Sequence, residues 1–331
     1  MRVTVVGAGS WGTATAVQLA QNAHQVTLWA RRPELARRIQ SSGTNEDYVP
    51  GVMLPKNVNT LSNIEAALET AEAIVLATPS KALRDTCELL SPFYTEGTPL
   101  LLLSKGIENE SGLFLLDVVH QVLASGASQA VLSGPNHAEE VARGMLSATV
   151  VASENHEVAR LFQELFTTQS FRVYTSEDVR GVQICGAAKN IIAIGAGIVV
   201  GSGLGDNAAA MVMTRGLAEI SRLVAAVGGE SQTCMGLAGM GDLIATCTSR
   251  HSRNRSFGEA LAAGETLTSY ETHTHMVVEG ALACNSVVHL AARHEVEMPL
   301  CEMIRRAVWQ GLSLDNMILS LMQRPTKPEF Y

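Results

Sequence analysis

The sequence predicts an α/β fold in which an open, doubly wound parallel sheet is followed by a mostly α-helical region. Three observations predict it. Short runs rich in β-branched residues alternate with helix-length segments over about the first 180 residues. A glycine-rich turn directly follows the first run, at residues 7–12. Beyond about residue 180 the short runs give way to long stretches rich in Ala, Leu and Met. Strands that alternate with helices are typical of parallel α/β sheets.

Seven short runs are the candidate strands. They cover residues 3–6, 26–29, 74–77, 100–103, 130–132, 149–152 and 171–174. Most are nearly continuous apolar runs, which is the pattern of strands buried on both faces of a parallel sheet. Helix-length segments such as residues 13–21 and 154–166 lie between several of them. This succession predicts a sheet with helices on both faces.

The sequence pattern of the second half of the chain predicts helices. Candidate helices cover residues 182–200, 207–227, 255–263, 276–294 and 299–310, and glycine-rich loops separate the first three. We therefore expect two domains, over residues 1–181 and 182–331. There is no internal repeat and no low-complexity tract.

Composition limits what the chain binds. The 331 residues carry 24 Lys and Arg against 32 Asp and Glu, a net charge of −8. This balance argues against nucleic acid or a membrane surface as the main partner. The apolar stretch at residues 184–200 is interrupted by Lys189 and Asn190 and is shorter than the about 20 residues of a membrane span. Six scattered cysteines without a C-x-x-C pair indicate reduced thiols, no metal site and a cytoplasmic protein.

The turn at Gly7-Ala8-Gly9-Ser10-Trp11-Gly12 has the G-x-G-x-x-G spacing. A strand precedes it, a helix follows, and a second strand ends about 20 residues later, which is the context of a dinucleotide site. Gly7, Gly9 and Gly12 would let a pyrophosphate approach backbone amides at a helix N-terminus. Residues 1–181 are therefore predicted to form a Rossmann-type dinucleotide-binding domain.

The end of the second candidate strand bears on the choice of cofactor. NAD-specific sites usually place Asp or Glu there, whereas this chain has Arg31 and Arg32. Two guanidinium groups suit the 2′-phosphate of NADPH through charge-assisted hydrogen bonds. We expect NADPH to be preferred and NADH to be possible. Glu34 counts against this expectation, and solvated charges at the start of a helix after Pro33 are the alternative.

Nine motifs carry a resemblance to a known family. They are GAGSWGTATA at 7–16, NEDYVPGVMLP at 45–55, SKG at 104–106, LSGPNHAEE at 132–140, TSEDVRGVQICGAAKN at 175–190, GDN at 205–207, TRGLAE at 214–219, GLAGMGDLIATCTSRHSRN at 236–254 and VVEG at 277–280. With them the chain resembles the bacterial NAD(P)-dependent glycerol-3-phosphate dehydrogenases over essentially its whole length. The resemblance implies reversible reduction of dihydroxyacetone phosphate to sn-glycerol 3-phosphate, a supply of glycerol phosphate for phospholipid synthesis, and a homodimer.

The resemblance also implies roles for matching positions. Lys189 would be the general acid/base. The substrate-binding positions would be Lys105, Gly134, Asn136, Lys189, Asp242, Ser252, Arg253 and Asn254. The cofactor contacts would be Ser10, Trp11, Arg31, Tyr48, Lys105, Ala138, Arg253, Val277 and Glu279. Residues 182–331 would thus form the substrate-binding and catalytic domain.

The surroundings of Lys189 fit an acid/base. The stretch 184–192 is otherwise apolar apart from Asn190, and desolvation there would lower the pKa of the lysine. Lys105 would lower it further if close, whereas Asp242 would act in the opposite direction. Asn190 would orient the carbonyl or the lysine. The alternative is a lysine whose stem packs while its ammonium group reaches water.

A substrate phosphate needs several donors, and Ser252, Arg253 and Asn254 supply three in succession. A loop that opens the helix through Phe257 would add backbone amides. Such a triplet alone is usually an ordinary loop. Its position after the glycine-rich segment 236–242 and the resemblance favour the phosphate site.

Two other functions stay open. One is an NADPH-dependent reductase of a different small ketone, carboxylated rather than phosphorylated. The other is a redox sensor that binds the dinucleotide and signals through the helical region. A sensor has no need of a lysine and a phosphate site assembled across two domains. Consumption of NADPH with dihydroxyacetone phosphate, and not with ketoacids, would separate all three.

Overall fold

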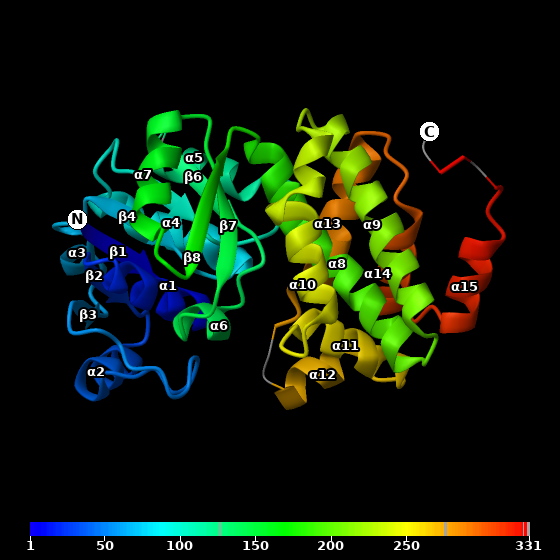
Figure 1. Cartoon of the computed structure of the whole chain (residues 1–331), viewed down its shortest axis with the longest axis horizontal. Coiled ribbons are helices and arrows are strands. Elements are labelled where there is room, and N and C mark those ends of the chain that lie inside the picture. Colours follow the sequence, from blue (N-terminus) through cyan, green and yellow to red (C-terminus); the bar gives the residue numbers. More distant parts are fainter. Residues whose placement is uncertain (125, 127, 275–276, 327, 330–331) are drawn as a thin grey trace.

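The computed structural model of the chain describes residues 1–124, 126, 128–274, 277–326 and 328–329. A sheet-containing part and a helical part lie side by side along the long axis of the molecule (Figure 1). The predicted fold class is therefore confirmed. The strand-rich part ends at Ser176 and the first long helix begins at Val179. The domain division after residue 181 stays a prediction.

Eight strands form one sheet in the order β3-β2-β1-β4-β5-β6-β7-β8. The strands are β1 (Arg2–Val6), β2 (Gln25–Trp29), β3 (Val58–Leu61), β4 (Ala73–Leu76), β5 (Leu100–Leu102), β6 (Gln129–Ser133), β7 (Ser147–Ala152) and β8 (Phe171–Ser176). All seven candidate runs are strands. The eighth, β3, was missed because its four residues VNTL include two polar ones and lie at the edge of the sheet.

The sheet departs from the parallel arrangement at one junction. β6 and β7 pair antiparallel, whereas every other neighbouring pair is parallel. The reason lies in the connection, whose helix α6 (Ala138–Ala142) has five residues. Such a helix rises about 7.5 Å, less than half of a typical strand of about 17–20 Å. The connection therefore lacks a helix of the length that usually carries the chain back to the starting edge, and β7 runs in the opposite direction.

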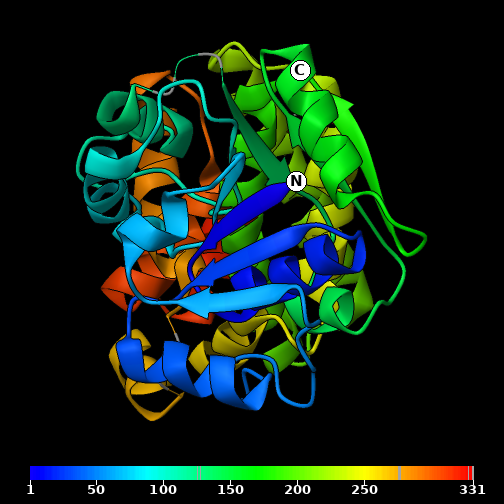
Figure 2. The same cartoon turned by 90° about the vertical axis from the view of Figure 1, so that its left-hand side faces the viewer.

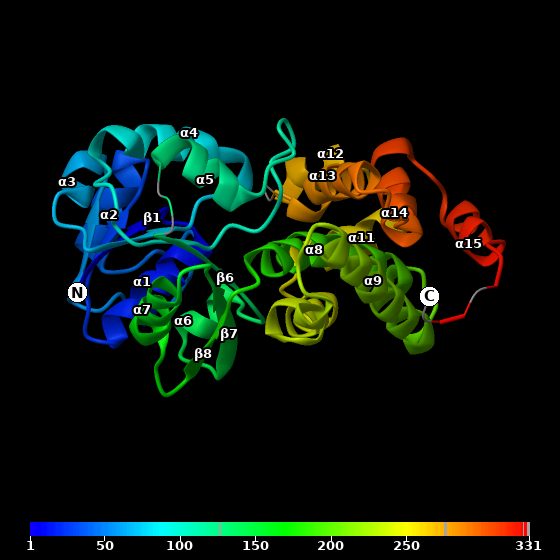
Figure 3. The same ribbon diagram turned by 90° about the horizontal axis from the view of Figure 1, so that it is seen from above.

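Helices cover both faces of the sheet. Figure 3 shows α4 and α5 on one side and α1, α6 and α7 on the other. The helices of this part are α1 (Ser10–Gln21), α2 (Pro33–Ser42), α3 (Ile64–Leu68), α4 (Leu83–Leu90), α5 (Leu115–Leu123), α6 and α7 (His156–Phe166). Val5 of β1 packs on the side of α1 and α7, and Val6 packs on the side of α4 and α5. Alternate residues thus enter two separate cores, as expected for a strand buried on both faces.

The helical part contains α8 (Val179–Gly201), α9 (Asp206–Ala226), α10 (Asp242–Thr248), α11 (Arg253–Ala262), α12 (Leu267–Thr274), α13 (Glu279–Arg293), α14 (Pro299–Gln310) and α15 (Leu314–Met322). The five predicted helices are α8, α9, α11, α13 and α14. Residue 276, where we expected one of them to start, lies outside the described residues, and α13 begins at Glu279. The short helices α10, α12 and α15 were missed, because fewer than three turns give a weak periodicity.

Helix α8 is the core of the second part. Every residue from 181 to 199 is buried. It is long and apolar enough to cross a membrane. However, 89% of its most apolar 18-residue stretch is buried inside the protein, as in the core helix of a globular protein. Glycines let α11 approach it closely, because a Cβ on Gly197 would lie 2.1 Å from the carbonyl oxygen of Arg255. A Cβ on Gly258 would lie 2.1 Å from that of Ile194. The N-terminus of α11 is therefore held against the middle of α8.

The sheet reverses its winding direction at β1. The chain runs from β1 outward to β2 and β3 and then returns to place β4 on the other side of β1. Figure 2 looks onto this end of the molecule, with the N-terminal strands in front. In open α/β sheets, ligands bind beyond the carboxyl ends of the strands at such a reversal. The loops that follow β1, β2, β5 and β6 carry most of the candidate residues of the sheet part.

Candidate active site

Three charged side chains from distant parts of the chain meet between the two halves. Lys189 comes from the middle of α8, Asp242 from the first turn of α10, and Lys105 from the loop after β5. The Nζ of Lys105 lies 2.7 Å from the Oδ2 of Asp242. The Nζ of Lys189 donates to the other carboxylate oxygen, Oδ1. One carboxylate therefore holds two ammonium groups, and sequence reasoning named all three residues.

This cluster has little contact with solvent. Lys189 is 7% exposed and Asp242 is 2% exposed. Burial lowers the pKa of Lys189 to about 8; the charge of Lys105 acts in the same direction, while Asp242 opposes both. Burial by itself would raise the pKa of Asp242, but the two ammonium groups hold it below its usual value. A lysine with a pKa near 8 can both give and take a proton close to neutral pH.

Thr246 is a member of the cluster that sequence reasoning missed. Its Oγ1 accepts a hydrogen bond of 2.8 Å from the Nζ of Lys189 and donates one of 2.6 Å to the backbone carbonyl of Asp242. Residues four apart lie on one face of a helix, so the spacing from Asp242 was the available signal. Ser133, at the end of β6, reaches Asp242 Oδ2 from the sheet side at 3.5 Å.

The other substrate positions on the sheet side lie beside Lys105. The carbonyl oxygen of Gly134 is 3.5 Å from the Nζ of Lys105. A Cβ on Gly134 would lie 2.8 Å from the Cα of Thr149, so a larger residue would push the strands apart. The Nδ2 of Asn136 donates to the Oγ1 of Thr149 at 3.1 Å. These residues are brought together at the carboxyl end of β6.

The predicted phosphate triplet opens α11. Ser252 caps the helix, its Oγ accepting from the backbone N–H of Arg255 at 3.3 Å. The Nδ2 of Asn254 donates to the Oδ1 of Asn190 at 3.0 Å, and its Oδ1 accepts from the backbone N–H of Gly280 at 2.9 Å. Asn190 thus holds Asn254 rather than Lys189. Ser252 and Asn254 are buried, whereas Arg253 is exposed and forms no ion pair within the part of the chain that the structure describes.

The glycine loop after β1 fits a dinucleotide. A Cβ on Gly7, whose φ is +115°, would lie 2.8 Å from the carbonyl oxygen of Ala77 after β4. A Cβ on Gly12 would lie 1.8 Å from the carbonyl oxygen of Gly7. Only glycine is tolerated at these two positions. Gly9 precedes the first residue of α1, and apart from its chain neighbours no atom of the described residues lies within 4 Å of where a Cβ would stand. This open space at a helix N-terminus suits a pyrophosphate.

The candidate 2′-phosphate residues lie past the end of β2. Arg31 and Arg32 are exposed, and the Nη2 of Arg32 lies 3.4 Å from the hydroxyl of Tyr48. The backbone carbonyl of Tyr48 accepts from the Oγ of Ser10 at 3.1 Å. The Oε1 of Glu34 lies 3.7 Å from the Nη2 of Arg37 on the exposed side of α2. The carboxylate that counted against NADPH therefore faces a different arginine.

The remaining cofactor candidates are spread over three elements. Trp11, in the first turn of α1, and Ala138, the first residue of α6, both pack at the edge of one small apolar cluster. Val277 is half-buried just before α13, and Glu279 is its first residue. Glu279 is close enough to Lys189 for its charge to raise the pKa of that lysine slightly. The second part of the chain thus brings a carboxylate toward the cluster.

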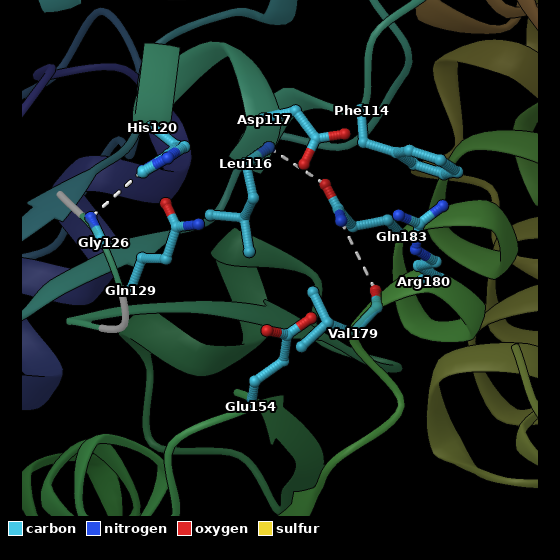
Figure 4. Close-up of a pocket in the computed structure, with 10 residues that line it drawn as sticks. All are labelled: Phe114, Leu116, Asp117, His120, Gly126, Gln129, Glu154, Val179, Arg180 and Gln183. Atoms are coloured by element: carbon cyan, nitrogen blue, oxygen red, sulfur yellow. Dashed lines mark hydrogen bonds between the residues drawn. The ribbon is translucent and has the colours of Figure 1, made fainter. Parts of the chain in front are cut away.

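A cavity of about 290 Å³ lies elsewhere, between α5 and the start of α8 (Figure 4). Its lining residues are Phe114, Leu116, Asp117, His120, Gly126, Gln129, Glu154, Val179, Arg180 and Gln183. Inside it, the side-chain oxygen of Gln183 accepts from the backbone N–H of Leu116 at 3.1 Å, which joins the two halves. None of the candidate residues lines this cavity. The Lys189 cluster therefore stays the candidate active site.

Comparison with known proteins agrees with this architecture. The profile of the NAD-dependent glycerol-3-phosphate dehydrogenase N-terminus matches residues 2–159, and that of the C-terminus matches residues 178–319. A relative from Prosthecochloris aestuarii, named glycerol-3-phosphate dehydrogenase (NAD(P)+), is 45% identical over 99% of this chain and 100% of its own length. One from Mycobacterium tuberculosis H37Rv, named glycerol-3-phosphate dehydrogenase (NAD(P)+) 2, is 47% identical over 99% of this chain and 98% of its own.

A solved structure gives the same picture. The crystal structure of glycerol-3-phosphate dehydrogenase from Coxiella burnetii superposes with a TM-score of 0.93 at 36% identity, covering 98% of this chain and 99% of that one. The resemblance seen in the motifs is thereby confirmed, and the chain belongs to the NAD-dependent glycerol-3-phosphate dehydrogenase family.

Proposed function

We propose that the chain reduces dihydroxyacetone phosphate to sn-glycerol 3-phosphate, reversibly and with NADPH in preference to NADH. The single observation that carries the proposal is the cluster of Lys189, Asp242 and Lys105, which joins α8, α10 and the loop after β5. It unites a desolvated acid/base, an anchoring carboxylate and a second cation at one point. Family membership supplies the substrate class.

The nicotinamide supplies the hydride chemistry, and the protein supplies the proton and the positioning. Lys189 in its ammonium form donates a proton to the oxygen of the substrate carbonyl during reduction, and the neutral amine accepts it in the reverse direction. Asp242 and Thr246 fix the lysine by two hydrogen bonds. The low exposure of the cluster excludes water, which strengthens these interactions.

We assign the substrate phosphate to the N-terminus of α11. Arg253 is exposed and has its guanidinium fork available, and forks of this kind bind phosphate oxygens in pairs. The helix N-terminus adds a favourable dipole. Asn254 is held toward Lys189's neighbour Asn190 by its side-chain amide. Holding the phosphate here would keep the carbonyl near the buried lysine.

The preference for NADPH rests on Arg31 and Arg32. Both are exposed beyond β2, and no carboxylate among the described residues pairs with either. The names of the relatives support dependence on NAD(P)+ only in general. A homodimer, a cytoplasmic location and a supply of glycerol phosphate for phospholipid synthesis belong to the same proposal, and family membership supports them.

A spectrophotometric assay tests the proposal. Purified protein is mixed with NADPH, and the absorbance of the reduced nicotinamide is followed after addition of dihydroxyacetone phosphate, unphosphorylated dihydroxyacetone or small ketoacids. We expect rapid loss of absorbance with the phosphorylated ketone alone. Turnover of a ketoacid at a comparable rate would favour the other reductase, and binding of NADPH without turnover of any ketone would favour the sensor.

A further inference from the structure

A segment outside the predicted elements packs against the glycine loop and α1. It runs from Thr44 to Met53, whose backbones form an antiparallel bridge that closes its base. Val49 and Val52 are buried in a small cluster with Ala14 and Val17 of α1. We call residues 44–53 the strap. Apart from Tyr48, none of its residues has a role in the function proposed above.

Asn45 is the most buried polar group of the strap, at 1% exposure. Its Nδ2 donates to the carbonyl oxygen of Ala8 at 3.0 Å and to the Oγ1 of Thr13 at 2.7 Å. Ala8 belongs to the glycine loop, and Thr13 lies in the first turns of α1. Because a backbone carbonyl can only accept, the NH2 end of the amide must face the loop. The Oδ1 of Asn45 is buried and has no partner among the described residues. The side chain therefore acts as a double donor.

The bond to Ala8 has a consequence for the next residue. In a planar trans peptide the C=O of one residue and the N–H of the next point in opposite directions. Holding the carbonyl of Ala8 toward the strap turns the N–H of Gly9 away from it. No acceptor among the described residues takes the N–H of Gly9, and the space beside Gly9 is open. An amide fixed in this way is prepared to donate to an anion.

We propose that Asn45 is a positioning residue that sets the pyrophosphate-binding loop, and does so for NADPH and NADH alike. The inference rests on the proposed binding of a dinucleotide at this loop. NADPH and NADH differ only in the 2′-phosphate, and Asn45 forms no hydrogen bond with Arg31 or Arg32 among the described residues. It acts on the loop that both share, through the carbonyl of Ala8 and the hydroxyl of Thr13.

The test compares Asn45→Ala with a matched variant, Asn57→Ala. Asn57 uses its Nδ2 in the same manner at the other end of α1, donating to the carbonyl oxygens of Ala20 at 2.8 Å and His24 at 2.7 Å. Each variant loses two neutral hydrogen bonds at one end of α1, one to the helix and one to the segment next to it. The Kd values for NADPH and NADH are measured by nicotinamide fluorescence without substrate, and the Tm values by circular dichroism.

We expect Asn45→Ala to raise the Kd values for NADPH and NADH by the same factor. That factor should be roughly 10-fold, the scale of two lost neutral hydrogen bonds. Asn57→Ala should lower the Tm and leave both Kd values within about twofold. Thr13→Val, which removes one acceptor and keeps the bond to Ala8, should weaken binding less than Asn45→Ala does. This milder variant also serves if Asn45→Ala does not fold.

Equal Kd changes in Asn45→Ala and Asn57→Ala would overturn the inference, because the effect would then be one of general stability. Weakened binding of NADPH alone would overturn it as well, since the loop is common to both dinucleotides. Failure of the unmodified protein to bind either dinucleotide is a different result, and it would contradict the proposed function itself. The three patterns are distinguishable in one set of titrations.

Discussion

The proposed active site contains two kinds of cation, which differ in burial and in pairing. Lys189 and Lys105 are withdrawn from water and share the carboxylate of Asp242. Arg31 and Arg253 are exposed and form no ion pair within the described residues. The lysines lie on or beside rigid core elements, whereas the arginines lie where a strand ends and a helix begins.

This difference reflects two tasks, proton transfer by a lysine and phosphate binding by arginines. A proton donor needs a shifted pKa, which requires burial, and a buried charge requires a partner. A phosphate-binding guanidinium needs open donors, and an internal carboxylate would compete with the ligand. An acidic protein with a net charge of −8 therefore keeps these arginines away from its own carboxylates. Each prediction below tests one side of this division.

The largest effect is expected at the buried side. Lys189→Ala removes the proton donor, so kcat should fall by at least about 10², the usual scale for a general acid/base. The Kd for NADPH should stay close to that of the unmodified protein, because the glycine loop is untouched. Steady-state kinetics and fluorescence titration measure the two quantities, with Lys56→Ala, an exposed lysine, as control. A fall in kcat of less than tenfold would remove Lys189 from the role of proton donor.

On the exposed side, Arg253→Ala should lower kcat/KM for dihydroxyacetone phosphate by roughly 10²–10³, or about 3–4 kcal/mol in the transition state. The phosphate is remote from the reacting carbon, and its binding positions the carbonyl, so kcat should fall together with a rise in KM. Activity on unphosphorylated dihydroxyacetone should hardly change. A comparable loss on both ketones would show that Arg253 acts on the fold or on the cofactor instead.

The same division explains what could be predicted from the sequence. The proposed recognition residues and the proposed proton donor belong to contiguous motifs, so Lys189, Arg253 and the glycine loop could be named as candidates from the sequence. The seven strands were found because apolar runs buried on both faces leave a strong local signal. Thr246, Ser133 and Asn45 were missed as functional groups, because each acts through a contact that only the folded chain creates. The antiparallel β6–β7 pair likewise was not predicted, because the apolar runs of the two strands carry no signal for their relative direction.

A smaller effect is expected for the choice of cofactor. Arg31→Asp should abolish most of the preference for NADPH, a change of roughly 10- to 100-fold in the ratio of the two kcat/KM values, since it removes charge-assisted hydrogen bonds and adds repulsion. As a control, Arg37→Asp changes an exposed arginine of α2 beside Glu34 and should leave the ratio unchanged. Equal kcat/KM with NADPH and NADH in the unmodified protein would contradict the assignment of Arg31.

The smallest effect concerns the coupling inside the buried cluster, and it is read as a shift in a pH profile. Reduction requires the ammonium form of Lys189, whose pKa is lowered to about 8 chiefly by burial. The kcat/KM for reduction should therefore fall as the pH rises through about 8, while that for oxidation should rise.

Lys105→Met removes a like charge, which favours the ammonium form of Lys189. It also leaves the carboxylate of Asp242 to Lys189 alone, which acts in the same direction. Both changes raise the pKa of Lys189, so the fall in the reduction rate should move to higher pH. The overall rate of this variant will also drop if Lys105 binds substrate, but the position of the inflection does not depend on that drop. An inflection that stays in place or moves to lower pH would mean that Lys105 does not share the electrostatic environment of Lys189. The contrast between carboxylate-paired lysines and unpaired arginines would then hold for Lys189 alone.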